Sequence, residues 1–148
     1  YLGAENLERV NDRLQAKLSV IKKEEVRYHE YETEDADLLL VAFGTMGRTC
    51  QSVVNTARAQ GIRVGLLRPI TLWPFPEQRI AQLSEQVRGV LVVEMNAGQM
   101  VEDVRLAVEG RSPVSFYGRT GGIVPLPDDI YPELQKLDKE TAVPPAKN

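Results

Sequence analysis

The spacing of apolar residues predicts a helix in the first part of the chain. Leucine, valine and isoleucine recur every three or four positions, with charged residues between them, at Leu7, Val10, Leu14, Leu18 and Ile21. This pattern is typical of an amphipathic helix of about five turns. We expect residues 1–25 to form a connector helix whose narrow apolar stripe packs along a neighbouring domain or subunit, or on the chain's own sheet.

From residue 26 onward, short apolar runs alternate with longer amphipathic segments. Residues 26–33 alternate in the manner of an exposed edge strand, and four apolar runs predict buried strands at 38–43, 62–67, 90–93 and 114–117. The segments between and after them predict helices at 49–60, 77–86, 99–109 and 127–137. We therefore expect one domain over residues 26–137, followed by a frayed tail over residues 138–148.

Strands that alternate with helices indicate a parallel sheet covered on both faces, with right-handed crossovers. Four loops then leave the carboxyl ends of the parallel strands, at residues 44–48, 68–76, 94–99 and 118–122. These loops hold most of the glycines and the unusual polar residues, and open α/β sheets bind ligands at this edge. The candidate ligand-rim or interface residues are Gly44, Thr45, Gly47, Arg48, Arg68, Trp73, Glu94, Asn96, Gln99, Arg119 and Thr120.

The segment Gly44-Thr45-Met46-Gly47 follows a predicted strand and allows two interpretations. Its backbone N–H groups could bind an anion at a helix N-terminus, with Arg48 and Thr49 alongside. It lacks the third glycine of a dinucleotide fingerprint and the Gly-Lys-Ser/Thr of a P-loop. A tight turn without a ligand is therefore the favoured reading.

The other candidate residues could each have a structural role instead of a functional one. Arg68 and Arg119 could bind carboxylate or phosphate, or could pair with Glu94 or an acid at an interface. Trp73, between prolines, indicates a rigid apolar contact surface. Glu94 could be a general base, but an acid in this position is more often a charge partner or an acceptor of backbone N–H groups. These residues do not form a complete catalytic set, so we assign no catalytic residue.

Composition excludes several classes of protein. The 148-residue chain has a net charge of −3, which gives no basic field for nucleic acid or an anionic membrane. The single cysteine, Cys50, excludes an internal disulfide and fits a reducing compartment, so we expect a cytoplasmic protein. With one cysteine and one histidine, His29, the chain cannot alone build a Cys/His zinc site or an iron–sulfur site.

Four segments together resemble a known family. ADLLLVAFGTMG, RVGLLRPITLWPFP, VLVVEMNAGQM and FYGRTGG, in this order, are similar to the C-terminal domain of the α subunit of 2-oxoacid:ferredoxin oxidoreductases. The resemblance covers about residues 6–137 and is nearest to members that act on 2-oxoisovalerate or 2-oxoglutarate.

The resemblance implies a three-layer α/β/α sandwich of the transketolase C-terminal type, with a five-stranded, mostly parallel sheet whose first strand is antiparallel. It also implies a complex that decarboxylates a 2-oxoacid to an acyl-CoA with thiamine diphosphate, magnesium, iron–sulfur clusters and CoA, none of them bound by this domain alone. The implied partners are the pyrimidine-binding domain of the same subunit, a thiamine-binding β subunit, a small iron–sulfur subunit and ferredoxin. We expect the chain to be a fragment that is inactive by itself.

Two other functions remain open from the sequence. One is a regulatory module that binds a small anion or nucleotide through residues 44–47 and Arg48. The other is the C-terminal domain of a transketolase or a 2-oxoacid dehydrogenase, which shares the implied fold. An exposed apolar face around Trp73 and a narrow-striped first helix also predict self-association of the isolated chain.

Overall fold

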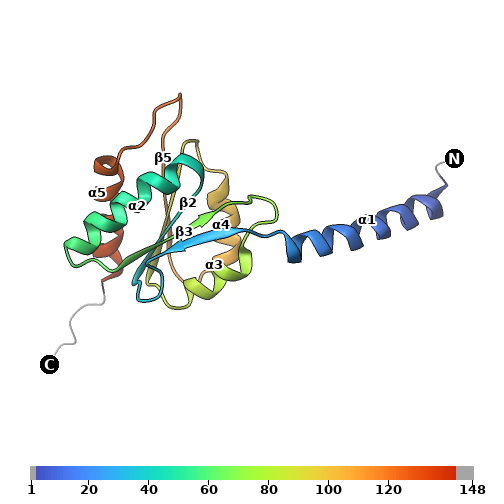
Figure 1. Ribbon diagram of the computed structural model, residues 1–148, viewed down its shortest axis with the longest axis horizontal. Helices are drawn as coiled ribbons and strands as arrows, with labels where there is room; N and C mark the ends of the chain where they lie inside the picture. Colours follow the sequence, from blue (N-terminus) through green and yellow to red (C-terminus); the bar gives the residue numbers. More distant parts are fainter. Residues whose placement is uncertain (1–2, 143–148) are drawn as a thin grey trace.

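The computed structural model describes residues 3–142 and contains five helices and five strands in that range (Figure 1). In chain order they are α1 (Ala4–Glu24), β1 (Tyr28–Tyr31), β2 (Leu38–Ala42), α2 (Gly44–Ala59), β3 (Val64–Pro69), α3 (Glu77–Ser84), β4 (Gly89–Glu94), α4 (Met100–Val108), β5 (Val114–Gly118) and α5 (Pro127–Thr141).

The strands form one sheet in the order β1-β3-β2-β4-β5. Strand β1 pairs antiparallel with β3, and the other neighbours are parallel, which confirms the predicted topology. β2 and β4 are buried along their whole length, as expected for apolar runs without a polar break. The parallel strands end together at one edge, here called the rim: residues 43–48, 68–76, 94–99 and 118–126.

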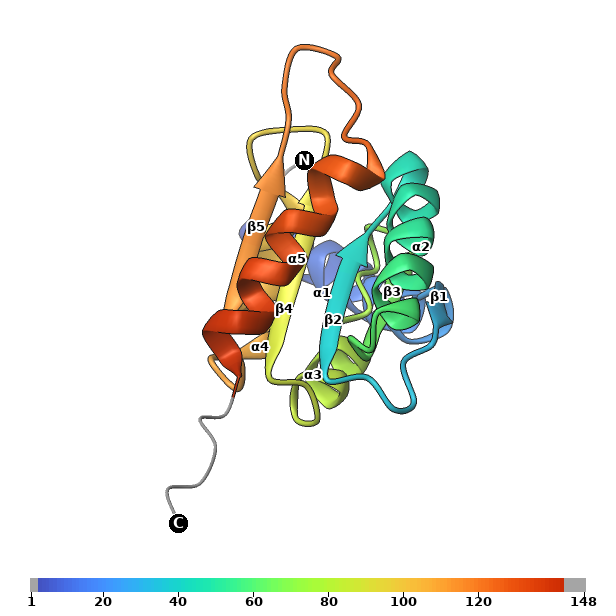
Figure 2. The same ribbon diagram turned by 90° about the vertical axis from the view of Figure 1, so that its left-hand side faces the viewer.

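Helices cover both faces of the sheet. Figure 2 shows α2 and α5 in front of the strands and α3 and α4 behind them. Alternate residues of β2 serve the two cores: Leu38 and Leu40 pack toward α2 and α5, whereas Leu39 and Val41 pack toward α3 and α4. This alternation is the two-residue period of a strand, and it confirms the three-layer sandwich. Cys50 of α2 lies within the first core, where burial raises the pKa of its thiol to about 12.

Helix α1 extends away from this body (Figure 1). None of its residues is buried, and Leu7, Val10 and Leu14 are 46%, 42% and 47% exposed. Within the described residues the helix does not pack on the chain's own sheet, so that one of the two expected arrangements is wrong. Its cover by another domain or subunit stays a prediction.

Three predicted boundaries also change. Helix α2 begins at Gly44 instead of residue 49, because the Gly47 N–H already bonds the Phe43 carbonyl at 3.3 Å. Gly44 to Gly47 are therefore the first turn of the helix. Strand β1 covers only Tyr28–Tyr31 of the expected 26–33.

The closing helix continues beyond residue 137 to Thr141. Arg88 donates to the Asp138 carbonyl at 2.8 Å and to Thr141 Oγ1 at 2.6 Å, and it also pairs with the Asp138 carboxylate. These bonds hold the last turn of α5 against the sheet, so fraying does not start at residue 138. Residues 143–148 of the expected tail lie outside the described part of the chain.

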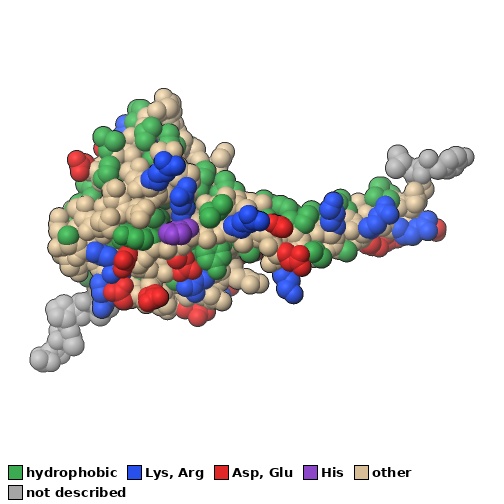
Figure 3. Space-filling model, viewed as in Figure 1, with side chains coloured by type: hydrophobic (Ala, Val, Ile, Leu, Met, Phe, Trp, Pro, Cys, Tyr) green, Lys and Arg blue, Asp and Glu red, His purple; other side chains and the backbone are tan. Residues whose placement is uncertain are grey.

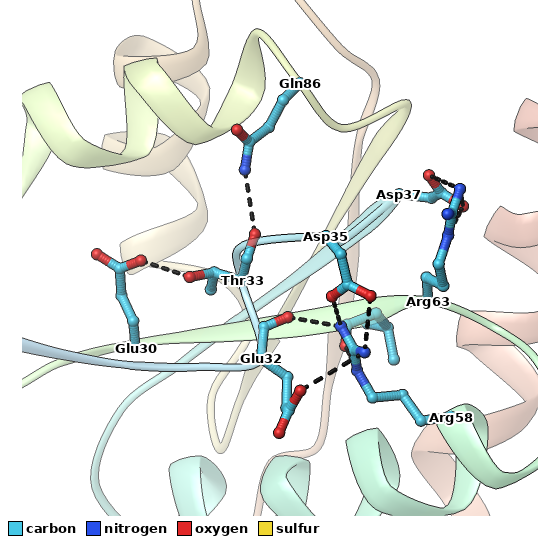
Figure 4. Close-up of polar contacts among 9 residues, drawn as sticks. Glu30, Glu32, Thr33, Asp35, Asp37, Arg58, Arg63 and Gln86 are labelled. Atoms are coloured by element: carbon cyan, nitrogen blue, oxygen red, sulfur yellow. Dashed lines mark hydrogen bonds and ion pairs between the residues drawn. The ribbon is translucent and has the colours of Figure 1, made fainter.

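The edge opposite the rim is held together by ion pairs (Figure 4). Arg58 of α2 bonds both carboxylate oxygens of Asp35, at 2.6 and 3.3 Å, and the carbonyl of Glu32 at 2.7 Å. Arg63 and Asp37 form a second bidentate pair at 2.9 and 3.0 Å. The Arg58 guanidinium lowers the pKa of Asp35. Both arginines at this edge thus have acidic partners within the domain.

Candidate functional site

The structure brings part of the predicted set together at the rim. Glu94, Asn96 and Gln99 form one hydrogen-bonded group after β4, and the Arg119 N–H, from the end of β5, bonds the Glu94 carbonyl at 3.3 Å. Gly47 and Arg68 form a second contact, between α2 and β3. Trp73 lies apart from both groups, in the wall of a cavity beside α1.

Glu94 is the centre of the first group and is 1% exposed. Its carboxylate accepts the backbone N–H groups of Gln99, Met100 and Val101 at 3.0 to 3.4 Å. The Asn96 side-chain amide donates to the same carboxylate at 3.0 Å. The buried acid therefore satisfies the free amides of the first turn of α4, where the helix dipole also favours a negative charge.

This geometry favours the interpretation of Glu94 as an acceptor of backbone N–H groups. A general base needs an oxygen free to take a proton from a substrate, and both oxygens of Glu94 are occupied by donors of its own chain. Glu94 is thus an acceptor that anchors the start of α4. Gln99, the residue before the helix, contributes its backbone N–H while its side chain is exposed.

The loop between β4 and α4 is shaped by a tight turn. The Asn96 side-chain oxygen accepts the Gly98 N–H at 2.7 Å, and Gly98 has a φ of +103°, which favours glycine. A Cβ at Gly118 would lie 2.4 Å from the Asn96 carbonyl oxygen, so glycine at the end of β5 lets the two rim loops approach closely. Sequence spacing did not reveal this contact.

Gly47 has a similar role beside Arg68. A Cβ at Gly47 would lie 2.6 Å from Arg68 Cδ and 2.8 Å from Arg68 Nε, so the arginine stem lies directly on the first turn of α2. Nε of Arg68 is buried and has no hydrogen-bond partner among the described residues. Thr45, Arg48 and Thr120 are exposed nearby along the rim, and Arg119 is half-buried.

A cavity of about 600 Å³ was missed by sequence reasoning. It lies between the last turn of α1, the loop 72–76 and α3, and its walls include Lys22, Lys23, Tyr28, Trp73 and Gln82. Next to it in the chain, the Ile70 N–H bonds the Arg27 carbonyl and the Arg27 N–H bonds Thr71 Oγ1, both at 2.9 Å, and these bonds join the segment after α1 to the start of the proline-rich loop. The proline-rich loop was the only sequence signal for it, because the cavity also needs α1.

The donor atoms of the described residues do not fit the metal centres that the family resemblance implies. The one thiol, Cys50, is buried in the core, so it does not offer an iron–sulfur ligand. Within residues 3–142 no group of three His, Cys, Asp or Glu side chains is placed to hold a metal ion. The described helices also include none long and apolar enough to cross a membrane.

Comparison with known protein families assigns this α/β domain to one of them. Residues 36–130 match the family model of the pyruvate:ferredoxin oxidoreductase core domain II. The chain therefore belongs to this family, as its four motifs suggested. The transketolase and 2-oxoacid dehydrogenase alternative is set aside by the match, although the fold is shared.

Individual relatives agree. The chain is 44% identical over 141 residues to the ketoisovalerate oxidoreductase subunit VorB of Methanothermobacter marburgensis. The match covers 95% of this chain and 40% of that relative, so the chain spans well under half of the relative's length.

Solved structures support the fold. A 2-oxoglutarate:ferredoxin oxidoreductase from Magnetococcus marinus, with 2-oxoglutarate, coenzyme A and succinyl-CoA bound, superposes with a TM-score of 0.76 at 17% identity, over 93% of this chain and 24% of that one. A split-gene transketolase, described as an inactive β4 tetramer, superposes with a TM-score of 0.66 at 18% identity, over 78% of this chain and 42% of that one. The fold is thus of the transketolase C-terminal type.

Proposed function

We propose that this chain is a domain of a ketoisovalerate-type 2-oxoacid:ferredoxin oxidoreductase subunit. In the complex it contributes to assembly and to the edge of the active site where a 2-oxoacid is oxidatively decarboxylated to an acyl-CoA. The observation that carries the proposal is the 44% identity to a ketoisovalerate oxidoreductase subunit along 95% of the chain.

The geometry supports a role in assembly more than one in catalysis. Glu94, the buried acid at the rim, accepts hydrogen bonds from backbone amides, and the Cys50 thiol is buried in the core. As the family resemblance implies, thiamine diphosphate, magnesium and CoA would be bound elsewhere in the complex, and iron–sulfur clusters by a small partner subunit. The other proposed partners are the pyrimidine-binding domain of the same subunit, a thiamine-binding β subunit and ferredoxin, in the cytoplasm.

An anaerobic assay with CoA, thiamine diphosphate, magnesium and a viologen acceptor tests this function. We expect the 148-residue chain alone to show no turnover, and the full-length subunit with its partner subunits to reduce the viologen. We also expect kcat/KM to be highest for 2-oxoisovalerate, with pyruvate and 2-oxoglutarate as matched substrates. Turnover by the chain alone, or none by the assembled complex with any of the three acids, would overturn the proposal.

A further inference from the structure

Most arginines of the domain form an ion pair within the described chain, and those without one lie together on the rim. Of the ten arginines between residues 27 and 119, seven form ion pairs with acids of the chain. Among the described residues the three without such a pair are Arg48, Arg68 and Arg119. All three lie on the rim: directly after the first turn of α2, near the end of β3 and directly after β5.

These three charges also lack a neutralising acid in the rim's own core. The backbone carbonyl of Glu94 accepts the Arg119 N–H, but the carboxylate oxygens of Glu94 are already bonded to the amides of α4 and to Asn96. Arg68 is separated from Arg119 by β2 and β4, that is by three strand spacings of about 4.8 Å, or about 14 Å. A protein surface can contact both positions at once.

Exposed apolar side chains gather on the same rim. Outside α1, the large hydrophobic residues that are most exposed are Tyr28 and Leu106 together with seven from the rim loops: Ile70, Leu72, Trp73, Met95, Ile123, Val124 and Leu126. Figure 3 shows Lys and Arg side chains gathered next to the histidine on the face over β1 and α2, with apolar side chains on the projecting loop above them. Arginine, methionine and aromatic residues together are the composition of a protein interface.

The chain enters the body at this rim. Tyr28, the first residue of β1, pairs with Pro69, the last residue of β3, so α1 is joined to the rim edge of the sheet. The relative is much longer than this chain, since the match covers 40% of it. A surface elsewhere in the same subunit would be held near the rim at a high effective concentration.

We propose that the rim docks on a surface of the parent subunit outside this chain, and that this surface presents carboxylates opposite Arg48, Arg68 and Arg119 around an apolar centre. The proposal rests on the proposed function, because it takes this chain as one domain of a longer subunit. It assigns the three unpaired arginines to recognition and the apolar rim residues to the buried centre of the contact.

Photo-crosslinking in the assembled full-length complex tests the contact directly. A photoreactive residue at Ile123 is compared with one at Leu106, which is 74% exposed on α4 away from the rim. We expect Ile123 to give at least a fivefold higher yield, with the crosslink in an acidic segment of the same subunit. Equal yields, or crosslinks from Ile123 only to another subunit, would overturn the proposal.

Charge reversal tests the arginines. Arg48→Glu and Arg119→Glu should each lower the Ile123 crosslink yield at least threefold and raise hydrogen exchange in residues 95–99 and 119–126. Arg105→Glu, on the exposed face of α4, is the control and should change neither. If millimolar inorganic pyrophosphate abolishes the crosslink as a saturable ligand, the rim is a small-anion site instead and the proposal fails. If the crosslinks form as expected but the complex does not turn over any 2-oxoacid, the proposed function is overturned and the docking proposal is not.

Discussion

At the scale of single residues, Glu94 links the sheet to its rim. It ends β4 and accepts three amide N–H groups of the next helix, so one side chain terminates the strand and starts the helix. Unsatisfied amides at a buried helix start are costly, and a carboxylate also interacts favourably with the helix dipole. Glu94 therefore contributes stability at a position that resembles a catalytic acid in sequence.

We expect Glu94→Gln to lower the free energy of unfolding by about 2 kcal/mol. The glutamine NH2 group would face backbone N–H groups, which are also donors, and the negative charge would be lost. Urea denaturation followed by circular dichroism measures the change. Glu102→Gln is the matched control, since Glu102 is exposed in the same first turn and should lose less than about 0.5 kcal/mol. Equal losses in the two variants would contradict the anchoring role.

At the scale of elements, the short edge strand β1 is held by side chains as well as by its ladder. Glu30 accepts two bonds from Arg79 of α3, at 2.6 and 2.9 Å, and one from Thr33 at 2.5 Å, the last of which is drawn in Figure 4. These bonds connect the strand to the α3 layer. The Arg79 guanidinium lowers the pKa of Glu30 below its ordinary value of 4.5.

A carboxyl whose pKa is lowered by folding stabilises the native state above its unfolded pKa and loses that contribution as the pH falls through its folded pKa. We therefore expect Glu30→Gln to cost about 1 kcal/mol at pH 7 and progressively less below pH 4.5. Denaturant titrations of both proteins at pH 7 and near pH 3 measure this. A difference that stays constant across that range would show that the ion pair is not its source.

The order and type of the elements followed from the sequence. The apolar runs at residues 38–43 and 90–93 had no polar break, and the amphipathic segments between strands had the helical period, so a covered parallel sheet was the consistent solution. Boundaries were less accurate, because they depend on contacts that the period does not encode. Arg88 holding the end of α5 is one example.

At the scale of the whole molecule, the body is covered on both faces while α1 and the rim are not. Leu7, Val10 and Leu14 present an uncovered stripe on a helix without buried residues. Apolar area on this scale is normally an interaction surface. In the proposed complex the parent subunit and its partners would cover it.

The isolated chain should therefore self-associate, and Leu14→Glu should weaken that association at least tenfold, because it places a charge in the centre of the stripe. Sedimentation velocity over a hundredfold range of concentration measures both. Glu8→Gln, outside the stripe on the same helix, should leave the association within a factor of two. A wild-type chain that stays monomeric at every concentration would contradict this expectation.

The sequence by itself determined the covered parallel sheet, its antiparallel edge through the family resemblance, and the edge at which the unusual residues meet. These features depend on local periodicity and on the rule that parallel strands end at one edge. It also singled out the rim residues, including Arg68, Glu94 and Arg119, without their roles.

Only the tertiary structure decided those roles. Whether an acid is free or bonded depends on which amides the fold brings to it, and the structure directs the α4 amides to Glu94. Whether an arginine is paired depends on acids that are distant in sequence: Arg58 reaches Asp35, whereas Arg48, Arg68 and Arg119 form no ion pair within the described chain. Long-range contacts of this kind arise from packing between elements, which no local pattern of residues contains.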